Sequence, residues 1–267
     1  MCFNIDINIT DFIIRISLEK IKNKKAYKEF SASIFHMFQD QILANNITSP
    51  NVIIHVQATS GDRLFTNKGG SLYAKIAKTT DSKTIYSNYS ISIIQLRFLV
   101  YMAFKLAVRN TINYFTFHAS GISYGNKVIL FMGDSEAGKS TIINLFANKK
   151  IRVFCDDLCL IKAERNYFSC NPVSLFQKIH INPEDRKYIL YKLMLLKKSD
   201  NFKIERIKIK NNQKLLTDFL KRQITNLMPF MKKQFTANLL KRHDGTISYL
   251  FFPKKQISED QFKQIIH

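Results

Sequence analysis

Hydrophobic positions in the second half of the chain change between short unbroken runs and helical spacing, a pattern typical of alternating strands and helices. Apolar residues at helical spacing over 141–148 predict a helix that follows directly on a buried strand. Gly121 and Gly125 mark a turn before that strand. The strands predicted from this region are residues 114–120, 127–132, 152–155 and 158–161.

Further along the chain, Pro183 and the two acids after it have the features of a helix start, because proline fits the first turn and acids stabilise the positive end. We therefore predict a helix over residues 183–196. The lysine-rich run 202–209 alternates as an edge strand does. The other predicted elements are a strand at 175–181, helices over 215–235 interrupted at Pro229, a strand at 248–252 and a helix at 258–266.

The first hundred residues show strand-like and helix-like segments without a regular order. The long apolar run 90–106 contains Arg97 and Lys105, which are costly inside a bilayer, so it predicts a helix packed beneath the sheet of the second half. A lysine-rich stretch at 20–28 is typical of a solvated loop or helix face. The remaining predictions are strands at 12–18 and 52–56, an amphipathic helix at 30–43 and a hairpin of 71–76 with 84–89.

These patterns predict an α/β protein of two parts. An N-terminal α+β region of residues 1–109 is expected to pack on a sheet domain of residues 110–267. With 46% hydrophobic residues, the chain can bury an ordinary core.

Candidate chemistry is concentrated in residues 133–141, which read GDSEAGKST and match G-x-x-x-x-G-K-[ST]. In this pattern the glycines let backbone N–H groups surround a polyphosphate, Lys139 reaches its terminal phosphates and the Ser140 hydroxyl binds magnesium. The predicted strand before it and helix after it are the context that the pattern requires. A glycine-containing turn that binds nothing has no use for Lys139 beside Ser140. The predicted nucleotide-binding residues are Gly133, Asp134, Ser135, Glu136, Ala137, Gly138, Lys139, Ser140 and Thr141.

Two neighbouring carboxylates, Asp156 and Asp157, follow the predicted strand at 152–155 and can lie at the same edge of the sheet as the loop. Paired carboxylates beside a phosphate site suit metal binding and general-base work. The alternative is a solvated turn between two strands. His118 ends the strand before the turn at Gly121, which brings it near the mouth of the loop. A single histidine on a strand is also often a purely structural residue.

The order FHAS, hairpin, GDSEAGKST, helix and FCDDLCLI, within residues 117–161, resembles the catalytic core of the HPr serine kinase/phosphorylase family. Its relatives include HPr-kinase-like enzymes encoded with modified peptides such as lasso peptides. The core is also similar to the nucleotide-binding half of phosphoenolpyruvate carboxykinases. The resemblance implies a P-loop sheet core that uses ATP and Mg²⁺. It also implies that Lys139 and Ser140 handle phosphate and magnesium, and that Asp156, Asp157 and His118 form the catalytic cluster.

The chain departs from the bifunctional HPr enzymes in two places. Its loop ends in GKST where theirs end in GKSE, and no glycine-rich signature follows, since Gly245 is the only glycine after Gly138. These departures argue against HPr as the acceptor and against the phosphorylase direction. The resemblance then implies transfer of the γ-phosphate of ATP to a serine-type hydroxyl of another peptide or protein, such as a lasso-type precursor.

Within this scheme the sequence leaves roles open. We favour Asp156 as the base and Asp157, with Ser140, as the metal ligand. Candidates on the phosphate side are Lys178, His180, Arg206, Arg222 and Arg242, and their spacing does not select among them. The resemblance to HPr kinases also implies a homo-oligomer.

The formal net charge of +21 favours an alternative function, a non-kinase P-loop NTPase that acts on nucleic acid. The basic residues are spread over the whole chain and lysine predominates, as an AT-rich codon bias produces, so we expect only non-specific binding of nucleic acid. A nucleotide-binding protein without chemistry is a third interpretation.

The four cysteines have neither zinc-site spacing nor a disulfide pattern. Cys155 and Cys159 fall in predicted strands, where we expect buried free thiols, and a reducing cytoplasm is implied. Asp6 and Asp11 interrupt the apolar N-terminal run, which argues against a signal peptide.

Overall fold

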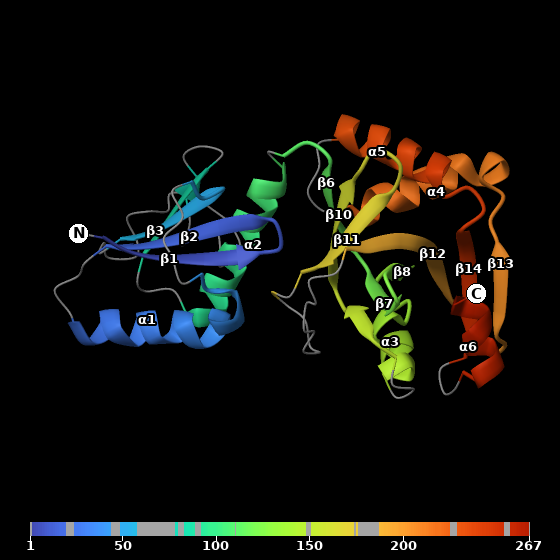
Figure 1. The fold of residues 1–267 in the computed structure, drawn as a ribbon, viewed down its shortest axis with the longest axis horizontal. Coiled ribbons are helices and arrows are strands. Elements are labelled where there is room, and N and C mark those ends of the chain that lie inside the picture. Colours follow the sequence, from blue (N-terminus) through green and yellow to red (C-terminus); the bar gives the residue numbers. More distant parts are fainter. Residues whose placement is uncertain are drawn as a thin grey trace. The chain divides into compact units, whose positions relative to one another are not determined.

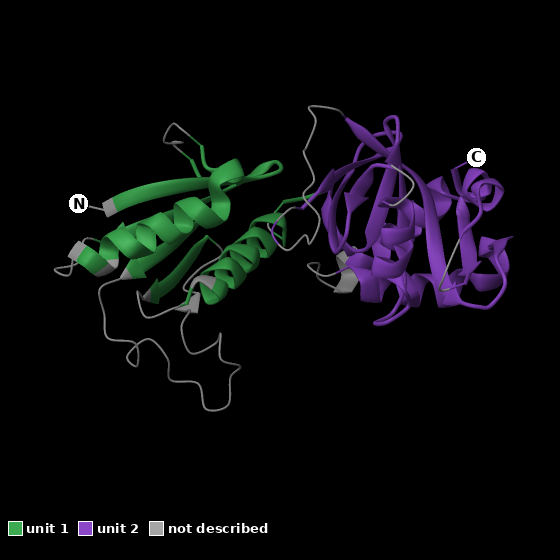
Figure 2. Ribbon diagram, turned by 90° about the horizontal axis from the view of Figure 1, so that it is seen from below, with its two compact units in different colours: residues 1–112 green, residues 113–267 purple. Residues whose placement is uncertain are grey.

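The computed structural model describes residues 2–19, 24–43, 49–57, 78–79, 83–88, 92–109, 111–147, 151–173, 175, 187–224, 229–253 and 257–266. The chain forms two compact units, residues 1–112 and 113–267 (Figure 2). The described residues combine two β-sheets with six α-helices, so the protein is of the mixed α/β class.

The first unit is a five-stranded sheet with helices α1 (Lys24–Phe38) and α2 (Ile93–Arg109). A short 3-10 helix, Gln39–Gln41, follows α1. The strands are β1 (Cys2–Ile9), β2 (Phe12–Glu19), β3 (Val52–Gln57), β4 (Lys78–Thr79) and β5 (Thr84–Asn88), in the order β1-β2-β3-β5-β4. β1 and β2 form an antiparallel hairpin, whereas β2, β3 and β5 run parallel.

The core of this unit lies on one face of the sheet. Alternate isoleucines of β1, Ile5, Ile7 and Ile9, are buried there. On β1 and β2, Asp6 and Arg15 pair at 2.7 Å between Oδ1 and Nε and at 2.8 Å between Oδ2 and Nη2. This charge-assisted, bidentate ion pair satisfies the hydrogen-bonding needs of the buried Asp6 carboxylate.

Several predictions for this unit are confirmed and others are corrected. β2, β3 and β5 lie where strands are predicted, whereas β1 is a strand that is not among the predicted elements, although its residues alternate between apolar and polar. α1 begins at Lys24, so part of the lysine-rich stretch is helical. α2 packs on β2 and β3 of the first unit, and the prediction that it lies beneath the second sheet is wrong. Residues 71–76 lie outside the described residues.

None of the described helices is both long and apolar enough to cross a membrane. α2 is the most apolar of the long helices, and its 17 residues include Arg97 and Lys105.

The second unit is built on a nine-stranded sheet (Figure 1). Its strands are β6 (Tyr114–His118), β7 (Ser120–Tyr124), β8 (Lys127–Met132), β9 (Val153–Cys155), β10 (Leu158–Ala163), β11 (Phe168–Pro172), β12 (Tyr188–Lys198), β13 (Lys203–Arg206) and β14 (Ile247–Phe252). Its helices are α3 (Lys139–Ala147), α4 (Ile209–Gln223), α5 (Pro229–Arg242) and α6 (Glu259–Ile266). The strand order is β6-β10-β11-β12-β8-β7-β9, with β14 beside β12 and β13 beside β14.

Helices cover both faces of this sheet. The apolar side chains of α4 and α5 are buried in one core of this sheet, and those of α3 and α6 in the other. Figure 1 shows where these helices lie along the sheet. β8 serves both cores, because Val128, Leu130 and Met132 point toward α4 and α5 while Ile129 and Phe131 point toward α3 and α6. Strands buried on both faces appear as unbroken apolar runs.

β12 occupies residues for which a helix is predicted, so that prediction is wrong from Tyr188 onward. β12 runs parallel to both β8 and β14 and is buried on both faces, with Leu193 and Leu195 in one core and Met194 and Leu196 in the other. An apolar run of this kind lacks the alternation that distinguishes a strand. Of the strand predicted at 175–181, Leu175 is the one residue that the structure describes, and its backbone is 3-10 helical.

Other predictions for the second unit agree with the structure in outline. The strands β6, β8, β9, β10, β13 and β14 and the helix α6 are confirmed, and the helix pair broken at Pro229 is α4 and α5. Gly121 lies within β7 and does not form a turn, whereas Gly125 does. Cys155 and Cys159 are free, buried thiols, as predicted.

The buried imidazole of His243 makes the second unit sensitive to acid. Its Nδ1 lies 2.9 Å from Thr246 Oγ1 and its ring stacks on Phe168. Burial, with a smaller contribution from Arg242, lowers its pKa from 6.5 to about 4. The unfolded chain therefore binds the extra proton first, and stability falls as the pH drops from about 6.5 toward 4.

We expect His243 to reduce the free energy of unfolding by about 2 kcal/mol between pH 7 and pH 5. Urea titrations at both pH values measure this. In His243→Asn, which has no group that titrates in this range, the difference between the two pH values should shrink by about that amount. His36→Asn, on an exposed part of α1, is the control. An unchanged pH dependence in His243→Asn would contradict the prediction.

Candidate nucleotide-binding site

The glycine-containing loop connects the end of β8 at Met132 with the start of α3 at Lys139. Two of its residues have positive φ, Glu136 at 63° and Gly138 at 98°. A Cβ on Gly133 would collide with that of Ala137, and a Cβ on Gly138 would lie 2.7 Å from Cζ of Phe252. The loop is therefore tightly closed, and α3 begins at its end, so a helix N-terminus that can bind an anion adjoins it.

Gly138→Ala should destabilise the second unit more than Gly125→Ala does. Both glycines have positive φ, so both substitutions incur the left-handed strain of about 1–2 kcal/mol. Only at Gly138 does the added methyl also meet the buried ring of Phe252, whereas nothing lies within 4 Å of it at Gly125. Urea denaturation of the two variants measures the difference. Equal losses of unfolding free energy in the two variants would show that the Phe252 ring moves aside without destabilising the fold.

Lys139 is the first residue of α3, and its side chain folds back along the loop. Its Nζ donates hydrogen bonds to the carbonyl oxygens of Gly133, at 2.8 Å, and Asp134, at 3.2 Å. Burial lowers the pKa of Lys139, while the charges of Asp157 and Asp134 act in the opposite direction. The ammonium group thus lies in a half-buried position within the field of two carboxylates.

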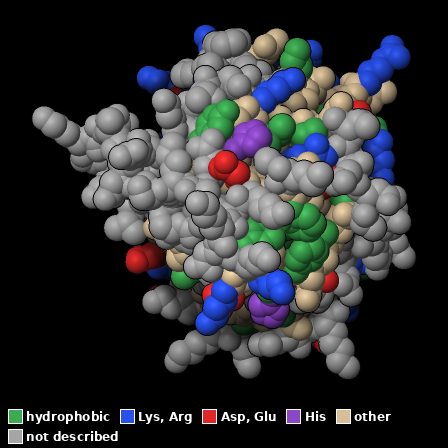
Figure 3. Space-filling model, turned by 90° about the vertical axis from the view of Figure 1, so that its left-hand side faces the viewer, with side chains coloured by type: hydrophobic (Ala, Val, Ile, Leu, Met, Phe, Trp, Pro, Cys, Tyr) green, Lys and Arg blue, Asp and Glu red, His purple; other side chains and the backbone are tan. Residues whose placement is uncertain are grey.

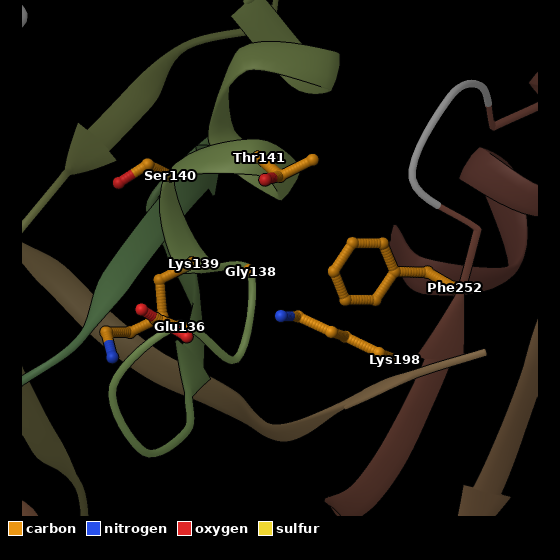
Figure 4. Close-up of a pocket in the computed structure, with 7 residues that line it drawn as sticks. All are labelled: Glu136, Gly138, Lys139, Ser140, Thr141, Lys198 and Phe252. Carbon is orange, nitrogen blue, oxygen red and sulfur yellow. The ribbon is translucent and has the colours of Figure 1, made fainter.

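A cavity of about 400 Å³ opens on this loop (Figure 4). Its size is in the range of small-molecule sites. It is lined by Glu136, Gly138, Lys139, Ser140, Thr141, Lys198 and Phe252. Figure 4 shows the amine of Lys198 and the ring of Phe252 pointing toward the loop. The cavity thus combines two lysines, two hydroxyls and a helix N-terminus, the groups that bind phosphate.

Lys198 and Phe252 were not among the residues predicted for this site. They end β12 and β14 and are direct partners in the parallel ladder between those strands. Because β12 also pairs in parallel with β8, the loop and both residues lie at the same edge of the sheet. The signal that could have identified them is the rule that ligands bind beyond the carboxyl ends of parallel strands.

Asp156, Asp157 and His118 meet where β9, β10, β6 and β7 come together. Asp157 Oδ1 lies 3.0 Å from His118 Nδ1, and each side chain is 44% exposed. Ser120 Oγ donates to the backbone oxygen of Asp156, at 3.2 Å, and lies 3.5 Å from its Oδ1. The N–H of Ala119 donates to the carbonyl of Asp157 at 3.1 Å. These bonds fix the bend that presents both carboxylates.

The structure thus pairs His118 with Asp157, and the negative charge of Asp157 acts to raise the pKa of Lys139. The side chain of Asp156 lies beside Ser120. The two acids therefore have different surroundings, as two different chemical roles require.

Of the three arginines considered for the phosphate side, Arg222 is the one beside the loop. Its Nη2 lies 3.9 Å from Asp134 Oδ1. Arg242 donates to the carbonyl oxygen of Glu164 at 2.7 Å, and the guanidinium of Arg206 packs on Gly245. Lys178 and His180 lie outside the described residues.

The residues present fit a magnesium nucleotide. Mg²⁺ in phosphate sites takes one or two protein oxygens, with phosphate and water supplying the others. Ser140, exposed at the start of α3, and the half-exposed Asp157 are oxygen donors of that kind. Among the described residues no group of three or more His, Cys, Asp and Glu side chains gathers into a metal site by itself. The oxygen atoms of Ser140 and Asp157 therefore suit a Mg²⁺ ion that binds together with a phosphate group.

Comparison by sequence finds no matching family model and no matching curated protein. Among solved structures, the chain is similar to the structure of the Hpr(Ser) kinase/phosphatase from Coxiella burnetii, with 13% identity and a TM-score of 0.30. The match covers 57% of this chain and 91% of that chain. A likeness at this level assigns neither family nor function.

Proposed function

We propose that the second unit is a P-loop kinase, distantly related to HPr kinases, that transfers the γ-phosphate of ATP to a serine-type hydroxyl of a peptide or protein. The observation that carries this proposal is the 3.0 Å pairing of His118 with Asp157 at the same edge of the sheet as the glycine-containing loop and its Lys139, because β7 runs antiparallel to both β8 and β9. Phosphoryl transfer needs positioned positive charge and a group that accepts a proton, and this arrangement supplies both.

The loop residues hold the nucleotide. Backbone N–H groups of residues 134–139 and the N-terminus of α3 bind the β-phosphate, and Lys139 offsets negative charge on the group being transferred. Ser140 and Asp157 hold Mg²⁺, which, when bound, neutralises phosphate charge. A bound phosphate would draw the Lys139 ammonium away from the carbonyl oxygens of Gly133 and Asp134 that it now contacts.

Asp156 acts as the general base in this proposal. The acceptor hydroxyl oxygen forms a bond to the γ-phosphorus, the bond from phosphorus to the ADP oxygen breaks, and the hydroxyl proton passes to the Asp156 carboxylate. His118 orients Asp157 through their 3.0 Å contact. A lasso-type precursor peptide is one acceptor that the sequence resemblance suggests, and the protein would then be a peptide-tailoring kinase.

The test uses the full chain with γ-labelled ATP, Mg²⁺ and mixed serine-containing peptides, with and without RNA or DNA. Label on serine supports the kinase. Label found only in inorganic phosphate, released faster when nucleic acid is added, would replace the kinase with the nucleic-acid-dependent NTPase.

That second function is favoured by the net charge of +21. On the face drawn in Figure 3, lysine and arginine side chains are scattered among hydrophobic, acidic and histidine side chains. Among the described side chains of this face, such scattering suits weak, non-specific attraction to polyanions better than a defined nucleic-acid groove. A homo-oligomer and a cytoplasmic location stay predictions from the sequence.

A further inference from the structure

A second cavity, of about 630 Å³, is lined by the first part of the glycine-containing loop and adjoins the first cavity at Glu136 and Lys198. We call it the α4 groove, because it runs between loop residues 133–137, residues 195–198 of β12, Tyr249 of β14 and one stripe of α4. That stripe consists of Leu215, Asp218, Phe219 and Arg222. These positions share a helix face by their spacing of three, four and seven residues.

The groove has an apolar floor and a charged rim. Leu215 is 57% exposed even though α4 buries Leu216 and Leu220 in the core beneath it. The rings of Phe219 and Tyr249 line the floor, with the guanidinium of Arg222 over the first at 5.7 Å and the amine of Lys197 over the second at 5.5 Å. An exposed apolar surface rimmed by charge is characteristic of binding sites.

One end of the groove lies beside the start of the glycine-containing loop and the end of β6. Gly133 and Asp134, whose carbonyl oxygens hold Lys139, both line the groove. α4 ends at Gln223, and the next residue, Ile224, forms a bridge with Phe117, the neighbour of His118. The stripe from Leu215 to Arg222 therefore leads toward the histidine and its carboxylate partner.

The side chains proposed to contact the terminal phosphates and the metal ion lie outside the groove. Lys139, Ser140 and Thr141 line the first cavity and not this one. The first cavity also contains the aromatic ring of Phe252, which suits a nucleoside beside its phosphates, whereas Lys198 lines both cavities. The α4 groove is therefore available to a second molecule while the first cavity holds a nucleotide.

We propose that the α4 groove holds the acceptor, as an extended peptide segment with an apolar or aromatic side chain on Leu215, Phe219 and Tyr249. This proposal rests on the proposed kinase function. Leu215 and Arg222 are seven residues apart, about 10 Å along a helix, the length of about three residues of extended chain. The apolar residue of the acceptor therefore lies about three residues from the hydroxyl that is phosphorylated at the Arg222 end. The transfer itself is the one written above, with the proton passing to Asp156.

The probe is a peptide library with one fixed serine and randomised flanking positions, incubated with the full chain, γ-labelled ATP and Mg²⁺. We expect labelled peptides to be enriched in Leu, Ile, Met or Phe about three residues from the serine. Leu215→Gln and Phe219→Ala should each lower that enrichment about tenfold, the usual worth of an apolar contact in specificity. The Kd for ATP should not change. Tyr124→Gln, which alters another exposed apolar residue of the same unit, is the control and should keep the enrichment.

The outcomes separate this proposal from the proposed function. Labelled peptides without positional enrichment, or with enrichment unchanged in Leu215→Gln, would overturn the groove as the acceptor site and leave the kinase standing. Absence of label in every peptide would overturn both. A higher Kd for ATP in Leu215→Gln, with peptide selection intact, would assign the groove to the nucleoside and overturn the proposal. If Phe219→Ala does not fold, Leu215→Gln decides, because its side chain is largely exposed.

Discussion

Lys139→Ala should lower kcat/KM for phosphate transfer at least about a hundredfold, the usual loss when one preorganised charge at a reacting group is removed. The ammonium group is half-buried, touches the first two carbonyl oxygens of the loop and feels the charges of Asp157 and Asp134. Its removal takes away the positive charge nearest the transferring group in the proposed mechanism. Initial rates of label transfer at saturating and limiting ATP measure the loss and divide it between kcat and KM.

The fold should survive this substitution, because the Lys139 side chain contacts loop carbonyl oxygens and contributes to neither hydrophobic core. Lys263→Ala is the matched control, since it removes the same charge from an exposed position on α6. Urea midpoints for both variants should stay close to that of the unaltered chain. A Lys139→Ala protein that transfers phosphate at the original rate would refute the site.

Asp156→Asn and Asp157→Asn should fail in different ways, because the two carboxylates have different neighbours. Asp156→Asn removes the proposed base, so we expect kcat to fall at least about a hundredfold with the affinity for ATP retained. Asp157→Asn removes a proposed metal ligand, so we expect the Mg²⁺ concentration needed for half-maximal activity to rise. Titrations of Mg²⁺ against the rate of transfer distinguish the two patterns.

Asp157→Asn has a second consequence that can be measured without activity. The negative charge of Asp157 raises the pKa of Lys139 against the effect of burial, so its loss should lower that pKa further. NMR of labelled lysine side chains, with Lys139→Arg to assign the signal, follows this. Asp260→Asn, on α6, is the control and should leave the signal in place. An unshifted Lys139 resonance in Asp157→Asn would contradict the prediction that the charge of Asp157 acts on Lys139.

The central elements of the site could be predicted because they are local in sequence. The strand, loop and helix from Lys127 to Ala147 carry their own glycine, lysine and hydroxyl pattern, and a bend between two short strands presents Asp156 and Asp157. Each depends on neighbours within a few residues, and local periodicity describes such neighbours well.

The other side of the site could not be predicted because it depends on pairing between distant strands. Lys198 and Phe252 reach the loop only because β8, β12 and β14 run parallel side by side. β12 was the element that the pattern misassigned, since burial on both faces removes the alternation of a strand. Leu215 and Arg222 of the α4 groove likewise acquire their neighbours from the way α4 packs.

The contact between Phe252 and Gly138 also has a consequence for biosynthesis. A ribosome releases the chain from its N-terminus onward, so the loop emerges long before the strand that presses on it. β8 can pair with β12 only after β12 has been synthesised, and β12 can pair with β14 only later still. Until more than a hundred further residues have been translated, the nascent chain therefore carries the glycine-containing loop without the strands that shape it.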